Sequence, residues 1–279
     1  MISVTVLFDW TSKKAGERNK RQMIFVLNSS KTIDMQPSAR KSKHSTPEFY
    51  AECASLVKAL RTLSVAELVS LMKISEKLAV LNVDRYRNWK MRPDSSNAKQ
   101  ALMAFKGDVF EAMNVDTYTV KDFDFAQQHL RILSGLYGIL RPLDLIQAYR
   151  LEMATKLSNA RGKNLYEFWG NRIHQSLGAL LKKEKSGVLI NLASLEYFKA
   201  VKADQLKATV ITPIFKEQRN SAYRVVAIYA KKARGRICDF IIRNRIDRPE
   251  DLKSFNSDGY GFSAKLSNST QWVFTRRSR

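Results

Sequence analysis

One short segment limits the possible folds more than any other. Residues Val188 to Ala193 are apolar at every position except Asn191. A strand with one exposed face alternates polar and apolar residues, whereas a strand covered on both faces is apolar throughout. Ser194 follows at once and is suited to cap a helix. The segment therefore predicts an α/β arrangement in which a buried strand leads straight into a helix, a place where such sheets hold ligands.

A second apolar segment, Met23 to Leu27, predicts another buried strand. It leads into the polar loop Asn28 to Thr32, where Lys31 makes an anion-binding corner plausible. The loop lacks the glycines of a nucleotide-binding P-loop. Thr209 to Phe215 is a further predicted strand, in which Pro213 indicates an edge or a bulge.

Helix signals occur between these strands. Thr46-Pro47-Glu48 has the capping residue and the early proline of a helix start. Ser64 with Glu67 forms a predicted capping box. No repeat or convincing linker is visible after Met23. We therefore predict an α+β (mixed α/β) fold in a single domain.

The segment from Phe125 to Met153 combines a helical pattern with Gly135, Gly138 and the pair Arg141-Pro142. The pattern predicts a helix, a glycine-containing hairpin and a second helix. One interpretation is a packed corner between helices. The other is a helix-hairpin-helix-like clamp, in which backbone N–H groups hold a nucleic-acid phosphate. The usual hairpin has its glycines two residues apart, and here they are three apart.

Composition adds a strong positive charge. The 279 residues carry a net charge of +22, and 44% of them are hydrophobic. Small soluble domains usually carry about 2 to 8 charges in magnitude, so this excess favours a polyanionic partner, with nucleic acid first. A membrane surface is a weaker alternative, because no long basic amphipathic helix is visible. A basic cytoplasmic protein without such a partner is the third interpretation.

Three cations cluster near the end of a predicted strand. The strand spans Ala222 to Ala230 and would deliver Lys231, Lys232 and Arg234 to the end of the sheet. Cations at a helix start are locally unfavourable. That cost favours a phosphate cradle over a solvated helix start.

Sulfur and imidazole side chains give no metal signature. Cys53 and Cys238 are far apart and lie beside apolar residues, so we expect reduced core thiols in a cytoplasmic protein. The histidines are scattered along the chain at His44, His129 and His174. We predict no metal and no cofactor, and the oligomeric state stays undetermined. Iron storage is disfavoured because the Glu-x-x-His pattern of such sites is missing from the sequence.

Five blocks in the same order along the chain resemble the YaaA family, the bacterial peroxide-stress resistance proteins. The blocks are residues 105–110, 125–153, 191–199, 229–235 and 255–260. The resemblance runs from Met23 almost to the C-terminus. In the loop after the first strand, Lys31 and Thr32 match the family's usual Ser-Pro-Ala-Lys-Thr, whereas residues 28–30 depart from it.

Because the family begins at the position of Met23, residues 1–22 are interpreted as an N-terminal extension and residues 23–279 as one family domain. We interpret these residues as the product of a spurious upstream start or as a dispensable extension. The alternative is a basic arm that adds DNA affinity. It does not resemble a signal peptide, because its apolar run precedes its charges.

The resemblance implies a central sheet wrapped by helices, DNA binding, and a role in limiting damage by peroxide and free iron. It implies no established reaction. The residues that we expect to contact duplex or branched DNA are Lys31, Lys106, Arg131, Gly135, Gly138, Arg141, Lys199, Lys231, Lys232 and Arg234. Cations and backbone donors contact phosphates rather than base edges, so binding should be largely independent of sequence.

The alternative function is an enzyme that acts on a nucleotide or nucleic-acid substrate. The polar residues that could converge in its cleft are Lys31, Lys106, Asp108, Asp144, Glu152, Glu196 and Lys231. Among them, Lys106, Asp108 and Glu196 are the candidates for acid–base catalysis. A closed cavity around these groups would favour the enzyme, whereas an open basic groove would favour the DNA-binding protein.

Overall fold

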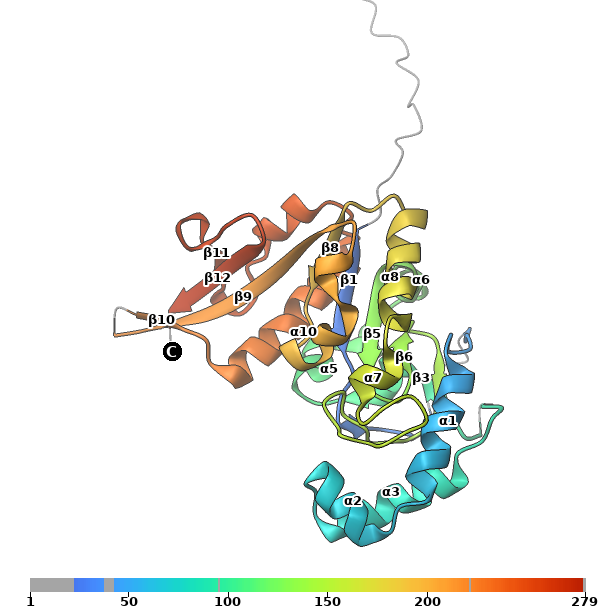
Figure 1. Cartoon of the computed structure of the whole chain (residues 1–279). Coiled ribbons are helices and arrows are strands. Elements are labelled where there is room, and N and C mark those ends of the chain that lie inside the picture. Colours follow the sequence, from blue (N-terminus) through green and yellow to red (C-terminus); the bar gives the residue numbers. More distant parts are fainter. Residues whose placement is uncertain (1–22, 38–42, 95, 221, 278–279) are drawn as a thin grey trace, which may run out of the picture.

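A mostly parallel sheet runs through the computed structural model, which describes residues 23–37, 43–94, 96–220 and 222–277 (Figure 1). The strand order is β11-β12-β9-β8-β1-β5-β6, and β10 pairs with β9. The strands are β1 (Ile24–Asn28), β5 (Leu130–Ser134), β6 (Gly138–Leu140), β8 (Val188–Asn191), β9 (Thr209–Arg219), β10 (Ala222–Arg224), β11 (Gly261–Phe262) and β12 (Gln271–Arg277). β5, β1, β8, β9 and β12 are parallel to their neighbours in this series.

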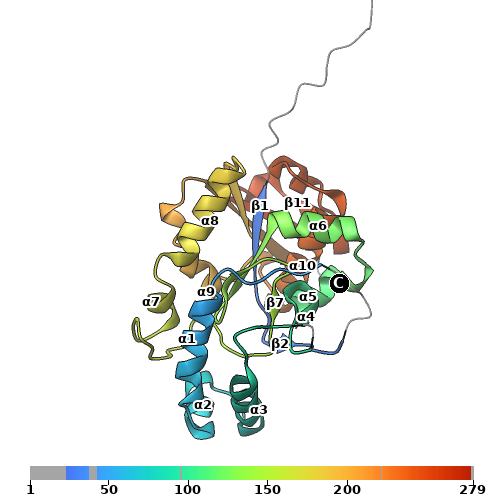
Figure 2. The ribbon, with the colours of Figure 1, turned by 90° about the vertical axis from the view of Figure 1, so that its right-hand side faces the viewer.

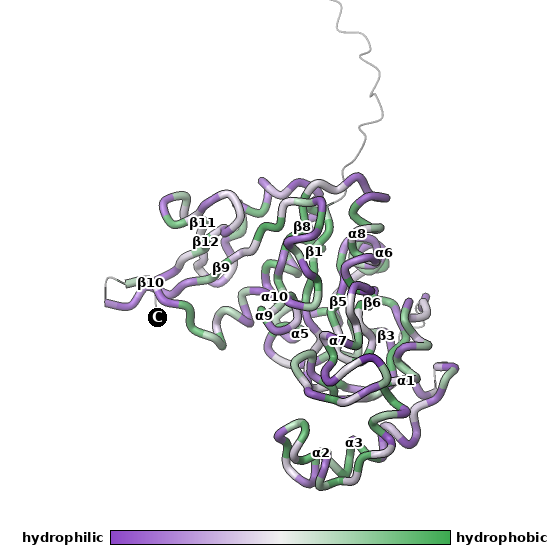
Figure 3. The backbone as a smooth tube through the Cα atoms, in the orientation of Figure 1, coloured by the Kyte–Doolittle hydropathy of each residue, from purple (hydrophilic) through white to green (hydrophobic). Residues whose placement is uncertain are grey.

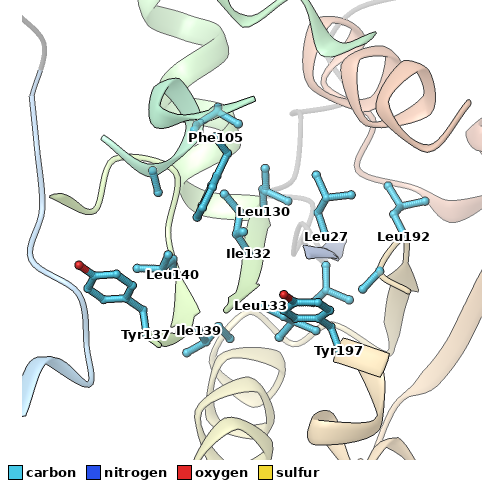
Figure 4. Close-up of a cluster of buried hydrophobic side chains, with 14 of the residues drawn as sticks. Leu27, Phe105, Leu130, Ile132, Leu133, Tyr137, Ile139, Leu140, Leu192 and Tyr197 are labelled. Atoms are coloured by element: carbon cyan, nitrogen blue, oxygen red, sulfur yellow. The ribbon is translucent and has the colours of Figure 1, made fainter. Parts of the chain in front are cut away.

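The central strand β1 is buried on both faces, as its apolar sequence requires. In the register, Phe25 lies opposite Leu130 of β5 on one side and Ile190 of β8 on the other. Figure 3 shows these central strands largely in the hydrophobic colour, and Figure 4 shows Leu27 among the side chains of the core. The predicted buried strands at 23–27 and 188–193 are confirmed by β1 and β8.

The long strand β9 pairs with β8 and β12 in turn, and near its end also with β10. Residues 209–211 pair with β8, and residues 212–218 pair with β12. Pro213 lies just beyond the β8 pairing, opposite Trp272 of β12. β9 is therefore not the edge strand that the proline suggested, and the proline, which lacks an N–H group, is tolerated because it lies beyond the residues paired with β8.

Helices cover both faces of the sheet. They are α1 (Tyr50–Arg61), α2 (Val65–Met72), α3 (Glu76–Asn88), α4 (Ala101–Ala104), α5 (Asp108–Met113), α6 (Val120–His129), α7 (Leu165–Trp169), α8 (Arg172–Lys183), α9 (Leu195–Phe198) and α10 (Ala227–Asn244). Figure 2 shows α7, α8 and α9 on one side of β1, and α5, α6 and α10 on the other. The α2–α3 pair projects from the body in both views.

The predicted fold class is confirmed: the protein is a single compact domain of mixed α/β structure, with helices around a mostly parallel sheet. The predicted capping box of α2 is also present, because Ser64 and Glu67 bond reciprocally. No helix in the described part of the chain is long and apolar enough to cross a membrane. Residues 1–22, predicted to be an extension, lie outside the described residues.

The helix-hairpin-helix predicted for Phe125 to Met153 is wrong for this segment. After α6 the chain forms the antiparallel pair β5 and β6, with Ile132 opposite Leu140. A short strand, β7 (Leu145–Ile146), then pairs with β3 (Lys99–Gln100). The glycines lie near the turn of a β-hairpin because β1 recruits the apolar residues of β5 into the sheet.

The strand predicted for Ala222 to Ala230 is also wrong beyond Arg224. The structure ends β10 at Arg224 and begins α10 at Ala227. Ala230, Ala233, Ile237 and Ile241 are buried at helical spacing along α10. Packing of this face overrides the local strand preference.

Candidate nucleic-acid interface at the carboxyl edge of the sheet

The strand order reverses direction at β1. The chain continues from β1 to β5 on one side, whereas β8 and β9 follow on the other side. In open α/β sheets, such a switch point leaves a crevice beyond the carboxyl ends of the strands. The loops after β1 and β8 meet here, because the Asn28 Oδ1 atom accepts a 2.9 Å hydrogen bond from the backbone N–H of Ser194.

The segment 149–154 crosses this carboxyl edge and brings three predicted residues together. The Lys31 Nζ atom lies 2.6 Å from the Glu152 Oε2 atom. Arg150 Nη2 donates to the other oxygen of Glu152 at 3.2 Å. The Glu196 Oε1 atom accepts a 3.0 Å hydrogen bond from the backbone N–H of Ala154. We call the loop 28–32, the segment 149–154 and the start of α9 the carboxyl-edge site.

Ser29, at a position where the resembled family has proline, is buried beneath this site. Its side chain lies close enough to the hydroxyl groups of Tyr149 and Tyr197 to lower their pKa values, which burial raises. The Tyr149 hydroxyl is also 2.6 Å from the Ser134 hydroxyl at the end of β5. The loop after β1 is held at Ser29 by the backbone N–H, which donates to the Leu133 carbonyl of β5 at 2.8 Å.

Lys106 and Asp108 border the same loop. β4 (Phe105–Lys106) pairs with β2 (Thr32–Ile33), and Lys106 lies opposite Thr32. The next residue, Gly107, has φ +102°, and a Cβ atom there would lie 3.1 Å from the Ser30 hydroxyl oxygen. Lys106 pairs with Asp116 at 3.8 Å. Asp108 begins α5, so both predicted residues lie beside the carboxyl-edge site.

The start of α10 lies along α5. The carbonyl oxygen of Val109 would be only 2.1 Å from a Cβ atom on Gly235. Arg236 donates to the carbonyl of Ala112, and Arg243 donates to the Thr117 hydroxyl further along. Because the two segments run in the same direction, residues 231–234 lie beside the start of α5.

The three predicted cations of α10 have no anionic partner. Lys231 and Lys232 are exposed. Arg234 is half-buried, and burial lowers its pKa. Among the described residues, none forms a hydrogen bond or an ion pair with these three side chains. A guanidinium group that loses water without gaining a partner is costly, so this cluster is poised to accept an anion.

Lys199 follows α9 and also reaches the carboxyl edge. Its Nζ atom lies 5.0 Å from the centre of the Tyr166 ring. The Tyr166 hydroxyl donates to the carbonyl oxygen of Glu196 at 2.9 Å. The cation–π contact holds the Lys199 charge beside Glu196 without neutralising it.

The two predicted arginines of the glycine segment bond within the protein. Arg131 Nη1 donates to carbonyl groups at the end of α6, and burial, with the charge of Arg141, lowers the Arg131 pKa to about 10. Arg141 forms a 2.9 Å ion pair with the buried Asp144. Both arginines therefore lie beside α6 rather than at the carboxyl-edge site. Asp144, which was a candidate for the cleft of an enzyme, instead has a structural partner in Arg141.

Both predicted glycines are packed against other atoms. A Cβ atom on Gly135 would lie 2.2 Å from the carbonyl oxygen of Leu151. Gly138 has φ +67° and lies against the Trp169 ring. Gly135 therefore allows the segment 149–154 to approach β5, and it positions Arg150 and Glu152 without exposing a phosphate-binding turn.

The turn that separates α2 from α3 was not predicted from the sequence. α2 and α3 are joined by Lys73, Ile74 and Ser75, and Lys73 has left-handed backbone angles of φ 52° and ψ 52°. Ile74 is buried, and the Ser75 hydroxyl caps α3 by accepting from the N–H of Leu78 at 3.4 Å. Ser75 before an apolar helical pattern was the available signal. We call residues 73–75 the α2–α3 turn.

Together, the topology and the carboxyl-edge site define an α/β protein with polar and cationic side chains gathered at the switch point of its sheet. The chain belongs to the family described as peroxide stress protein YaaA, whose sequence model matches residues 23–266. The expected family is thus confirmed, and membership supports a role in oxidative stress.

Relatives with the name UPF0246 protein cover nearly the same length. The protein from Paraburkholderia xenovorans is 49% identical over 257 residues, which are 91% of this chain and 99% of that protein. The one from Paraburkholderia phytofirmans is 50% identical over 257 residues, with the same coverage. The one from Teredinibacter turnerae is 46% identical over 255 residues, 91% of this chain and 100% of that protein.

Proposed function

We propose that this protein is a cytoplasmic DNA-binding protein of the peroxide stress response. It holds the phosphate backbone of DNA at the carboxyl-edge site and along the start of α10. The observation that carries the proposal is the cluster of Lys231, Lys232 and Arg234, three cations without a partner among the described residues, on a protein of net charge +22. Contacts of this kind are largely independent of sequence. The role in limiting damage by free iron comes from the family resemblance.

The α2–α3 turn supplies a second phosphate contact in this proposal. α2 and α3 are joined by this short turn, which lies outside the segment 125–153 where the helix-hairpin-helix was predicted. Lys73 and Lys77 are exposed at the turn. The backbone N–H groups at the start of α3 point out of the helix end, which favours an anion. The turn lies on the part of the protein that projects from the body (Figure 1).

The test replaces Lys231, Lys232 and Arg234 together with alanine. Each phosphate contact contributes about 0.9 to the slope of log K against log salt. We expect the triple variant to bind duplex DNA at least about tenfold more weakly and to lose about two to three units of slope. Fluorescence anisotropy with labelled duplex at several salt concentrations measures both quantities.

A matched control removes the same charge from the opposite edge of the sheet. Lys182, Lys183 and Lys207 are exposed near the amino ends of β8 and β9. Their replacement by alanine should change the affinity and the slope much less. Equal losses in the two triple variants would show that only net charge matters, and an unchanged slope in the α10 variant would refute the assignment.

A second candidate function is an enzyme acting on a nucleotide or a nucleic acid. The observation in its favour is that Lys31, Glu152 and Glu196 converge at the carboxyl-edge site. The Lys31 side chain, however, is 60% exposed. A proton-transfer pair normally needs burial to tune its pKa values. The open geometry therefore favours binding over acid–base chemistry.

A further inference from the structure

We propose a phosphate-binding site between α3 and the segment 149–154, in which Arg85 and Arg150 are the main ligands and Lys31 lies at the rim. The site would take the phosphate group of a nucleotide or of a nucleic acid. Arg85 comes from a helix that the carboxyl-edge site does not otherwise include. The proposal therefore deepens the proposed function, and it also stands if the bound phosphate belongs to a small molecule.

Tyr86 connects the two sides of the site. Its buried hydroxyl donates to the carbonyl oxygen of Arg150, which holds α3 against the segment 149–154. Arg85 is the preceding residue on α3 and is half-buried. Both arginine charges act on the Tyr86 hydroxyl, so the two guanidinium groups lie within electrostatic range of the same point.

The donors of these arginines are incompletely used. The Arg150 Nε atom is buried and has no hydrogen-bond partner among the described residues. Arg150 Nη2 reaches Glu152 at 3.2 Å. In the described part of the chain, Arg85 Nη1 hydrogen-bonds only to the amide oxygen of Asn82, at 3.4 Å. An unpaired buried N–H of a charged group costs free energy until an acceptor arrives.

The local charges do not balance. Arg85, Arg150 and Lys31 carry three positive charges, and Glu152, which pairs with both Arg150 and Lys31, supplies one negative charge. Burial lowers the pKa of Arg85, and the nearby Arg150 charge lowers it further. A dianionic phosphate would neutralise the excess of two charges.

A phosphate group fits this site better than an anion that carries a single charge. Two guanidinium groups offer planar pairs of N–H donors that match phosphate oxygens. Arg85 lies in the last turn of α3, at the opposite end of this helix from the α2–α3 turn. A nucleic-acid strand that crosses from the turn to the carboxyl-edge site would pass this position, whereas a nucleotide would place its phosphate here alone.

The experiment measures binding of inorganic phosphate and of adenosine monophosphate by calorimetry, and of duplex DNA by anisotropy. It compares the wild-type protein with Arg85→Ala, Arg85→Lys, Arg150→Lys and the control Arg87→Ala. Arg87 is an exposed arginine on the same helix. Since charged bidentate contacts are strong, we expect Arg85→Ala to weaken binding at least about tenfold. The two lysine variants should weaken it partly, and Arg87→Ala should change it little.

The results distinguish a site for nucleic-acid phosphate from a site for a small molecule, and a failure of this site from a failure of the proposed function. If Arg85→Ala weakens duplex binding more than Arg87→Ala does, the site holds a nucleic-acid phosphate. If it weakens only phosphate and the monophosphate, the site serves a small molecule. If these small ligands bind and DNA does not, the proposed function fails while this site stands. If DNA binds and no ligand depends on Arg85, the proposed function stands and this site is refuted.

Discussion

Replacing Asp144 with alanine is expected to lower the free energy of unfolding by about 2–3 kcal/mol, because the hydrogen bonds to a buried carboxylate are lost while the partly exposed Arg141 can be hydrated. The Asp144 side chain is 1% exposed. It accepts hydrogen bonds from the backbone N–H of Arg141 at 2.8 Å, from the Arg141 guanidinium at 2.9 Å, and from the Ser45 hydroxyl at 2.7 Å. Alanine would remove the acceptor of the Arg141 N–H and the Ser45 hydroxyl, whereas the Arg141 guanidinium keeps its 2.8 Å hydrogen bond to the Thr46 carbonyl.

Urea unfolding followed by circular dichroism measures this loss. Asp251→Ala is the matched control, because Asp251 forms an exposed ion pair with Arg248 at 2.8 Å. Solvent screens that pair, so its loss should be far smaller. An Asp144→Ala variant as stable as the control would contradict the structural role and would return Asp144 to the candidates for chemistry.

Gly235→Ala is expected to destabilise the protein by about 1–3 kcal/mol or more, the range typical of overpacking. An alanine inside a helix is normally favoured over glycine by about 1 kcal/mol. Here the added Cβ atom would lie 2.1 Å from the carbonyl oxygen of Val109 and 2.8 Å from the Cβ atom of Ala112. α10 would have to move away from α5, and DNA affinity should fall because Arg234 is carried along.

Gly178→Ala provides a control of opposite sign. Gly178 also lies inside a helix, α8, but a Cβ atom there would meet only the Leu206 Cδ2 atom, at an ordinary 3.8 Å. This variant should be as stable as the wild type or slightly more stable. Thermal unfolding of both variants tests the packing of α10 on α5. A stabilised Gly235→Ala variant would show that the helices are not in such close contact.

The parts of the fold that were predictable from the sequence are those that local chemistry determines. Continuous apolar runs identified β1 and β8, and a serine three residues before a glutamate identified the start of α2. The loop after β1 and the start of α9 were therefore expected to hold ligands, and Asn28 does connect the two.

The incorrect predictions concern elements that distant residues decide. Residues 130–134 become a strand because β1, about a hundred positions earlier, offers an open edge. Residues 225–230 contain β-branched and aromatic side chains, yet α10 forms because its apolar face packs on the sheet. Glycine spacing indicated a turn at Gly135 and Gly138, but it did not show that Leu151 and Trp169 fill the space around them.

The candidate site, like the fold, combines features that the local sequence indicates with features that depend on distant residues. The pairing of Lys31 with Glu152 and the hydrogen bond from the Tyr86 hydroxyl to the Arg150 carbonyl join residues far apart in the chain. No local pattern specifies such pairs. The sequence does indicate an excess of positive charge and the three adjacent cations of α10. The structure adds that these cations have no partner among the described residues.

The central claim is that DNA is held through its phosphates at a defined surface. Its most direct test is a salt titration of binding to duplex, single-stranded and branched DNA, with residues 23–279 compared with the full chain. We predict a steep linear dependence of log K on log salt, with different affinities for the three DNA forms. Weak binding that is lost equally for all three at physiological salt would contradict the claim, and substrates would then be screened against the carboxyl-edge site.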